Sequence, residues 1–316
     1  MTAKIIEASK ENIIFLSNEL KKGELVAMPT ETVYGLACDA TNVRAVKKIY
    51  QTKNRPNLNP LIAHYSDLDE LAKDVILNEK AIILAKKFWG GPLTLVLKKS
   101  KNCRIVNEAL AGLDTVAVRI PAHKIAQEFL SYCNFPVVAP SANISGKLSP
   151  VSASHVAKTL GNSIKWILDG GSSIKGIEST IIDLSNNSPT LLRAGSITID
   201  EISKALNLEI NLSKSDIALA PGMKYPHYKP TCKIRLNIDN PTYNEGLLAF
   251  GLDNIPSGYK HILNLSPSAN LEEAARNLFD FLHKLEDLKV ERISVMPIPN
   301  QGIGVAINDK LQKAAQ

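Results

Sequence analysis

The chain has 316 residues, 45% of them apolar, which is enough to bury the cores of two domains. Lys and Arg (37) outnumber Asp and Glu (31), and this net charge of +6 favours anionic ligands but is too diffuse to indicate nucleic-acid binding. No apolar run approaches the roughly 18 residues of a membrane helix, and no signal peptide is recognisable. The four scattered cysteines resemble neither a disulfide framework nor a zinc site. We therefore expect a cytoplasmic protein without a membrane partner.

Helical and strand patterns alternate over the first two thirds of the chain. Helices are predicted over residues 11–22, 43–51, 79–88, 124–132, 154–160 and 199–206. Strands are predicted over residues 25–28, 61–65, 93–97, 116–120, 136–139, 166–169, 180–184 and 190–193. The alternation predicts an α/β domain over residues 1–206, and the closely spaced strands near its end predict some antiparallel pairing.

Residues 207–232 interrupt this pattern and are predicted to be a linker. Three prolines within residues 220–230 favour an extended and stiff path. The segment also carries several side chains that suit ligand contacts: Lys224, Tyr225, His227, Tyr228 and Lys229. We therefore expect it to act as a lid as well as a tether, with Tyr228 against the ligand.

Residues 233–316 repeat the α/β pattern on a smaller scale. Strands are predicted over residues 232–237, 246–250, 261–265 and 292–296. Asn270 and Glu273 have the spacing of a capping box and precede a strongly periodic helix. Gly302-x-Gly304 lacks the third glycine of a dinucleotide fingerprint. We expect a small Rossmann-like domain that binds no nucleotide.

Polar side chains follow several of the predicted strands at the points where the strands end. Pro29 ends the first of these strands because it cannot donate to the ladder, so Thr30, Glu31, Thr32 and Tyr34 are displayed on a loop. Open α/β sheets bind ligands at the carboxyl ends of their strands. This loop is therefore a candidate binding site.

Lys53 and Arg55 are a candidate anion site. If the segment is extended, side chains two apart point to the same side and converge on one anion. The alternative is a solvated basic loop.

Arg119 and Arg193 end two further strands, and Ser141 and Asn143 follow a third, with Ser149 nearby. Short polar side chains near a glycine suit an anion-binding nest. Surface arginines and an ordinary turn are the alternatives.

Taken together, six segments resemble the YrdC-like domain of threonylcarbamoyl-AMP synthases. They are Pro29-Thr-Glu-Thr-x-Tyr-Gly-Leu, Lys53-x-Arg55, Phe88-Trp-Gly-Gly-Pro-Leu-Thr-Leu-Val-Leu, Val118-Arg-Ile-Pro121, Pro140-Ser-Ala-Asn-Ile-Ser-Gly146 and Leu192-Arg-Ala-Gly195. The linker and the second domain resemble the longer, two-domain branch of that family. The resemblance implies a YrdC-like twisted mixed sheet with flanking helices, followed by the Rossmann-like domain.

The resemblance also implies an activity and the residues that carry it. L-Threonine, bicarbonate and ATP, with Mg²⁺, give threonylcarbamoyl-AMP and pyrophosphate, and a downstream transferase uses the product to make threonylcarbamoyladenosine in tRNA. The implied ATP-binding residues are Lys53, Arg55, Asn59, Thr115, Ser141, Asn143, Ser149, Arg193 and Tyr228, with Lys53 and Arg55 catalytic. The implied threonine-binding residues are Thr32, His64, Arg119 and Ser179. Mg²⁺ is expected on the triphosphate without dedicated protein ligands.

Alternatives remain at this point. The chain is alternatively a non-catalytic RNA-binding module, or another carbamoyl-transfer enzyme that shares the domain. His64 is alternatively a buried strand histidine without a ligand.

Overall fold

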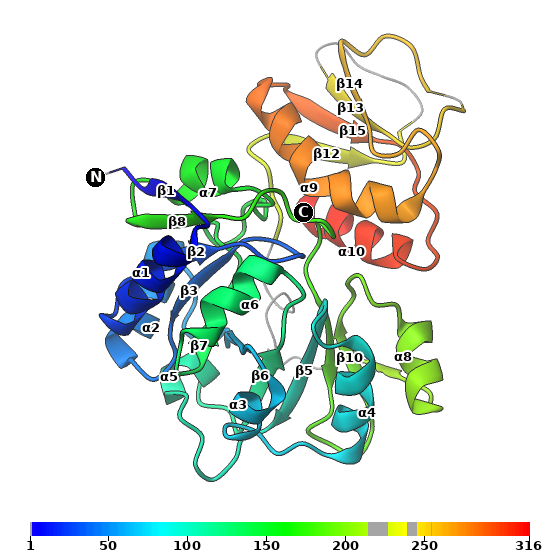
Figure 1. Ribbon diagram of the computed structural model, residues 1–316. Coiled ribbons are helices and arrows are strands. Elements are labelled where there is room, and N and C mark those ends of the chain that lie inside the picture. Colours follow the sequence, from blue (N-terminus) through cyan, green and yellow to red (C-terminus); the bar gives the residue numbers. More distant parts are fainter. Residues whose placement is uncertain (1, 214–226, 239–244, 254) are drawn as a thin grey trace.

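The computed structural model describes residues 2–213, 227–238, 245–253 and 255–316. Its two sheets, each with its own helices, form a larger and a smaller α/β unit (Figure 1). This confirms the predicted fold class. The boundaries 1–206, 207–232 and 233–316 stay a prediction, although residues 211–212 already pair with the larger sheet.

The larger unit alternates strands and helices in the predicted manner. Its strands are β1 (Lys4–Glu7), β2 (Val26–Met28), β3 (Gly35–Asp39), β4 (Ile62–His64), β5 (Leu93–Lys98), β6 (Thr115–Arg119), β7 (Val137–Val138), β8 (Trp166–Asp169), β9 (Thr180–Asp183), β10 (Thr190–Arg193) and β11 (Asn211–Leu212). Its helices are α1 (Lys10–Lys21), α2 (Val43–Lys53), α3 (Leu68–Ala72), α4 (Glu79–Phe88), α5 (Asn107–Leu110), α6 (Lys124–Ser131), α7 (Ala153–Leu160) and α8 (Ile199–Leu206).

The larger sheet is mixed, with the strand order β1-β8-β2-β3-β7-β4-β6-β5-β9-β10-β11. β4 and β6 are parallel, and their register places His64 beside Arg119. β9 and β10 are antiparallel, which confirms the pairing predicted from their close spacing. β4, β6 and β10 therefore run in the same direction, and the sheet brings their carboxyl ends, which are far apart in the sequence, to the same side.

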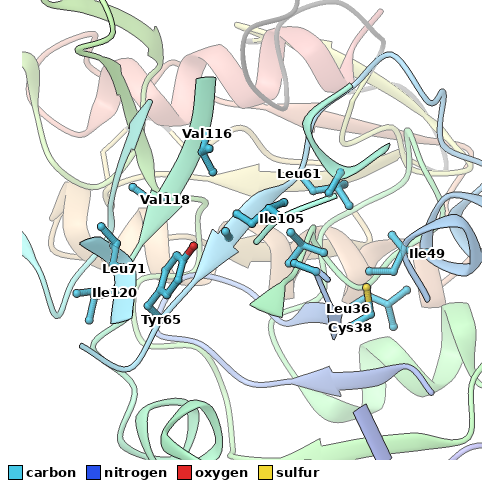
Figure 2. Close-up of a cluster of buried hydrophobic side chains, with 14 of the residues drawn as sticks. Leu36, Cys38, Ile49, Leu61, Tyr65, Leu71, Ile105, Val116, Val118 and Ile120 are labelled. Atoms are coloured by element: carbon cyan, nitrogen blue, oxygen red, sulfur yellow. The ribbon is translucent and has the colours of Figure 1, made fainter. Parts of the chain in front are cut away.

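A continuous apolar core fixes this sheet against its helices. Figure 2 shows part of it, with Leu36 and Cys38 of β3 beside Ile49 of α2, and with side chains of β6 farther along the same cluster. Leu36 and Val118 are fully buried, and Tyr65 donates a hydrogen bond to Asp74 at 3.0 Å so that its hydroxyl is not left unpaired. Rigid strands with buried side chains position the residues that follow them.

In its described residues the smaller unit is a parallel sheet with two helices. Its strands are β12 (Lys233–Leu236), β13 (Glu245–Ala249), β14 (His261–Asn264) and β15 (Arg292–Val295), in the order β12-β15-β13-β14. All of their pairings are parallel. The helices are α9 (Leu271–Asp287) and α10 (Gly304–Ala314). The parallel strands and the helical crossover from β14 through α9 to β15 agree with the Rossmann-like arrangement expected from the sequence.

The predicted capping box at the start of α9 forms only in part. The Asn270 side chain accepts a hydrogen bond from the backbone N–H of Glu273 at 2.9 Å, as expected. The Glu273 carboxylate instead accepts from the hydroxyl of Ser266 at 2.5 Å, and that hydroxyl accepts from the Asn270 N–H. The predicted return bond from the Asn270 backbone N–H to the Glu273 carboxylate is therefore wrong, because the Ser266 hydroxyl lies between these two groups.

The two units pack against each other through buried apolar side chains. α9 and α10 lie against the larger unit (Figure 1), and one apolar cluster joins Val33, Val151 and Ile177 to Leu278 and Phe279 of the smaller unit. Tyr228 belongs to this cluster and its ring centroid lies 5.3 Å from that of Phe279. The predicted linker is thus anchored at its C-terminal end, between the two units.

A stacked pair of histidines also bridges the units. The rings of His155 and His283 are 4.0 Å apart between centroids, and the His283 Nε2 lies 3.1 Å from the carbonyl oxygen of Ser149. Burial, and then the neighbouring His283, lower the pKa of His155 from 6.5 to about 4. Burial also lowers the pKa of His283. Both rings are therefore neutral at pH 7.

We predict that acid destabilises this junction. A histidine whose pKa is lower in the folded state binds more protons when unfolded, so stability is complete above pH ~6.5 and falls as the pH falls from ~6.5 toward ~4. Asp280, Lys158 and Asp287 also face His155, and their charges stay constant over most of this range. In thermal unfolding, the His155→Gln variant, whose side chain stays neutral, should lose less stability over this pH range than wild type. Identical slopes of stability against pH in the two proteins would contradict the prediction.

Candidate active site

A cavity lies against the larger sheet, along β4 from Ile62 to His64, and reaches several polar strand ends. The predicted site residues that line it are Thr32, Arg55, His64, Arg119, Ser141, Asn143, Ser149, Ser179, Arg193 and Tyr228. Arg119, His64 and Arg193 end β6, β4 and β10, and Ser179 directly precedes β9. Because these strands are neighbours in one sheet, segments far apart in the sequence converge here.

Arg119 and the Thr30–Thr32 loop form one end of the cavity. The Arg119 guanidinium donates to the Glu31 carboxylate at 2.5 Å, to the Thr32 hydroxyl at 2.9 Å and to the Gly91 carbonyl at 3.3 Å. Arg119 and Glu31 are only 4% and 1% exposed, so this charge pair is desolvated and its geometry is fixed. The arrangement presents a cation and a hydroxyl to a small polar ligand.

His64 lies beside Arg119 on the adjacent strand. Its Nδ1 is 3.1 Å from the carbonyl of Ile62, and this contact assigns the proton to Nδ1 and leaves Nε2 as an acceptor. Burial, together with the charge of Arg119, lowers the pKa of His64 to about 3. The ring is therefore neutral and can accept a hydrogen bond from an amine or a hydroxyl.

Arg55 and Arg193 supply positive charge on other walls. Arg55 donates to the carbonyls of Asn59 at 3.2 Å and Pro60 at 3.0 Å, and burial lowers its pKa to about 10, so it stays protonated at pH 7. Arg193 donates to the carbonyl and the hydroxyl of Ser179, both at 3.0 Å. Two cations held by the backbone are preorganised for a polyanion.

Lys53 is placed differently from the sequence expectation. It is the last residue of α2, is 1% exposed, and donates to the carbonyls of Ser141 and Asn143, each at 2.5 Å. The interpretation of Lys53 and Arg55 as an extended pair was wrong, because α2 continues to Lys53 and turns at Asn54, which has a φ of 50°. The ammonium supports the Ser141–Asn143 loop from behind, and Lys53 does not line the cavity.

Two more predicted residues lie outside the cavity lining. Asn59 is buried with its side-chain oxygen unpartnered among the described residues, while Thr115 begins β6 at the opposite end of the strand from Arg119. The Asn143 amide donates to the carbonyls of Ile144 at 2.9 Å and Lys147 at 2.8 Å, which fixes the loop that Lys53 supports. Asn143 itself lines the cavity.

Sequence reasoning assigned no role to two charged residues at the site. Glu178 lines the cavity and accepts a hydrogen bond from the Ser149 hydroxyl at 2.5 Å. Glu31 holds Arg119 from outside the cavity. Both stand directly beside motif residues in the sequence, Thr32 and Ser179, and that adjacency was the available signal.

The C-terminal end of the linker reaches the cavity. His227 and Tyr228 line it, and the Lys229 backbone N–H donates to the Gly146 carbonyl at 2.8 Å. Tyr228 is 4% exposed and has a φ of 65°. Lys224 and Tyr225 lie outside the described residues, so the expected lid remains a prediction.

Metal ligands are sparse at this site. In the described part of the chain no three His, Cys, Asp or Glu residues are grouped as a metal site would require. Among the described residues that line the cavity, Glu178 is the acidic one, and its carboxylate already accepts a hydrogen bond from the Ser149 hydroxyl. None of the helices described in the structure is long and apolar enough to cross a bilayer.

Comparisons with known proteins agree with this geometry. Residues 18–195 match the Sua5/YciO/YrdC family, described as telomere recombination, and residues 197–316 match the threonylcarbamoyl-AMP synthase C-terminal domain. A threonylcarbamoyl-AMP synthase of Pyrococcus abyssi is 42% identical over 94% of this chain and 92% of its own. One from Bacillus subtilis is 39% identical over 94% of this chain and 90% of its own. The crystal structure of P. abyssi Sua5 complexed with L-threonine superposes with a TM-score of 0.91 at 37% identity, covering 99% of this chain and 98% of that one.

Proposed function

The chain belongs to the threonylcarbamoyl-AMP synthase family with both family domains, and from this premise we propose that it converts L-threonine, bicarbonate and ATP into threonylcarbamoyl-AMP and pyrophosphate. The observation that carries the proposal is that one cavity holds two groups of residues, one suited to an amino acid and one suited to a polyanion. Arg119, Thr32 and His64 form the first, and Arg55 and Arg193 supply charge to the second.

Threonine binds at the Arg119 end in this proposal. The Arg119 guanidinium takes the carboxylate, and the neutral His64 Nε2 accepts a hydrogen bond from the amine or the hydroxyl. Ser179 and Thr32 complete the polar contacts. Ile62 and Ala139, which also line the cavity, give the methyl group an apolar surface.

The chemistry requires positioning more than a protein nucleophile. Threonine's amine adds to CO₂ derived from bicarbonate and loses a proton, and the resulting carbamate oxygen attacks the α-phosphorus of ATP while the bond to pyrophosphate breaks. Arg55 and Arg193, with Ser141, Asn143 and Ser149, hold the triphosphate and stabilise the charge that develops on it. Lys53 acts on this site through the Ser141–Asn143 loop.

In this proposal Mg²⁺ would be held with ATP and not by a protein cage, because the described lining offers only the carboxylate of Glu178, which already accepts a hydrogen bond from Ser149. When bound, it neutralises phosphate charge. The product is then passed to a transferase that completes threonylcarbamoyladenosine in tRNA, and we propose no direct tRNA contact for this chain.

The assay for the proposal is pyrophosphate release with one substrate omitted at a time. We expect release only when threonine, bicarbonate and ATP are all present. Release from ATP alone would indicate a different reaction, and no release under any condition would support a non-catalytic module.

The same assay tests the choice of amino acid. We predict a modest preference for threonine over serine, roughly 10-fold in kcat/KM, because one missing methyl against Ile62 and Ala139 is worth about 1–3 kcal/mol. Glycine lacks the hydroxyl as well, and leaves His64 or Thr32 unpaired, so it should be slower than serine by a further factor of about 10 or more. Equal rates for threonine and glycine would contradict a threonine pocket.

A further inference from the structure

Lys310 of the smaller unit is buried against the wall of the cavity. It lies in α10, is 1% exposed, and its Nζ donates to the carbonyl oxygen of Ala194 at 3.0 Å. The same Nζ lies 3.7 Å from the Glu178 carboxylate and 5.8 Å from the ring centroid of Tyr228. Burying an ammonium group is costly unless it is paired, so the position of Lys310 must be supported by these partners.

Glu178 is a negative charge in a cavity that is proposed to take a triphosphate. It is 6% exposed, lines the cavity, and accepts from the hydroxyl of Ser149, which lines it too. A desolvated carboxylate repels phosphate oxygens strongly because little water screens it. The site therefore needs the charge of Glu178 to be balanced.

We propose that Lys310 is a positioning residue that the C-terminal domain contributes to the ATP site: its ammonium neutralises Glu178 and holds that carboxylate on Ser149, so that the cavity accepts the triphosphate. This inference rests on the proposed function, because it assumes that ATP binds here. It gives the second domain a role in the first domain's chemistry. Lys310 reaches this position from the far end of the chain, 132 residues after Glu178 (310 − 178).

The other charges around this pair are accounted for. Glu178 also faces Arg193, and the pKa of Glu178 is lowered overall because Lys310, Arg193 and the Ser149 hydrogen bond outweigh its burial. His227 faces Glu178 too, but burial lowers the pKa of His227 to about 4, so it is neutral near pH 7. Tyr228 stays protonated because burial, and then Glu178, raise its pKa. Lys310 is therefore, with Arg193, a counter-charge that Glu178 depends on at neutral pH.

Lys310 is also the member of this group that loses its charge in mild alkali. Burial lowers its pKa to about 8, against the opposing effects of Glu178 and Asp309, while Arg193 and Lys313 act in the same direction as burial. ATP affinity should thus fall as the pH rises from 7 to ~9. Arginine at position 310 keeps its charge throughout this range, so Lys310→Arg should lose the alkaline decline.

The test measures ATP binding by calorimetry, without threonine, and then the KM of each substrate. Lys310→Met should weaken ATP binding by about 10-fold while the threonine KM changes by less than about 3-fold, because the uncompensated charge faces the triphosphate. The double variant Lys310→Met with Glu178→Gln should bind ATP at least about 3-fold more tightly than Lys310→Met alone. The amide oxygen of the glutamine still accepts a hydrogen bond from Ser149 but carries no charge. Lys313→Met, one turn along α10 and paired with Asp309, is the matched control and should bind ATP within about 2-fold of wild type.

Three results would overturn the inference. They are unchanged ATP binding in Lys310→Met, no recovery on adding Glu178→Gln, and an alkaline decline that Lys310→Arg retains. If Lys310→Met does not fold, Glu178→Gln alone decides, because the inference requires that variant to bind ATP at least as tightly as wild type. Wild-type protein that binds ATP without threonine-dependent pyrophosphate release would contradict the proposed function while leaving the Lys310 comparison intact.

Discussion

Arg55→Ala is expected to lower kcat/KM for ATP by about 100-fold or more. The variant loses charge-assisted hydrogen bonds to the triphosphate that are worth roughly 1.5–3 kcal/mol each, and two such bonds correspond to this factor. Steady-state kinetics at varied ATP measures it. Arg44→Ala, at an exposed position on α2, is the matched control and should be within about 2-fold of wild type.

The same substitution is also expected to weaken the fold, contrary to the view of Arg55 as a solvated loop cation. Its guanidinium donates to the buried carbonyls of Asn59 and Pro60. In the variant the Asn59 carbonyl keeps a hydrogen bond from the Tyr50 hydroxyl at 3.2 Å, whereas the Pro60 carbonyl loses the guanidinium as its donor. A buried carbonyl left unpaired costs about 1–3 kcal/mol. Urea unfolding must therefore accompany the kinetics. A folded Arg55→Ala enzyme with activity within 3-fold of wild type would contradict the ATP assignment.

Arg119→Ala is expected to lower kcat/KM for threonine by about 100-fold or more, with a smaller effect on the KM for ATP. The substitution removes the proposed carboxylate partner and leaves Glu31, which is 1% exposed, without its counter-charge. Removing one member of a buried ion pair costs about 3–5 kcal/mol of stability, so loss of folding is a real confounder.

A double variant separates binding from stability for this residue. Arg119→Met with Glu31→Gln removes both charges, so the protein should recover most of the lost stability while threonine use remains impaired. Arg119→Lys keeps a charge without the bidentate fork and should be intermediate. Recovery of threonine kcat/KM in the double variant would show that Arg119 only balances Glu31.

Several residues that line the cavity could be expected from the sequence because they stand at the ends of predicted strands. Arg119, Arg193 and His64 end strands that run in the same direction, and one sheet brings such ends to the same side. Ser141 follows β7, which is antiparallel to β4, so the end of its strand alone does not place it with them. The apolar runs that bury both faces of these strands are visible in the sequence. The family resemblance then gave the roles that topology cannot give.

Other features depend on contacts between distant residues and could not be predicted. Lys53 was expected in an extended loop, but its two carbonyl partners, on Ser141 and Asn143, keep it at the end of α2. β3 was missed because Gly35–Asp39 follows the polar loop without a turn residue between them, and its pairing with β2 sets its conformation. Glu178 has a role that depends on α10, and nothing in its local sequence identifies Lys310 as the partner.

The most direct test of the account is to follow isotopically labelled bicarbonate into the adenylate product by mass spectrometry. We expect one labelled carbon in every adenylate formed, together with threonine and AMP, and one pyrophosphate released for each. The carbamate, and not threonine's own carboxylate, is the group that attacks ATP. An adenylate that contains threonine and AMP but no label would mean that the carboxylate is activated directly, and this would contradict the proposed reaction.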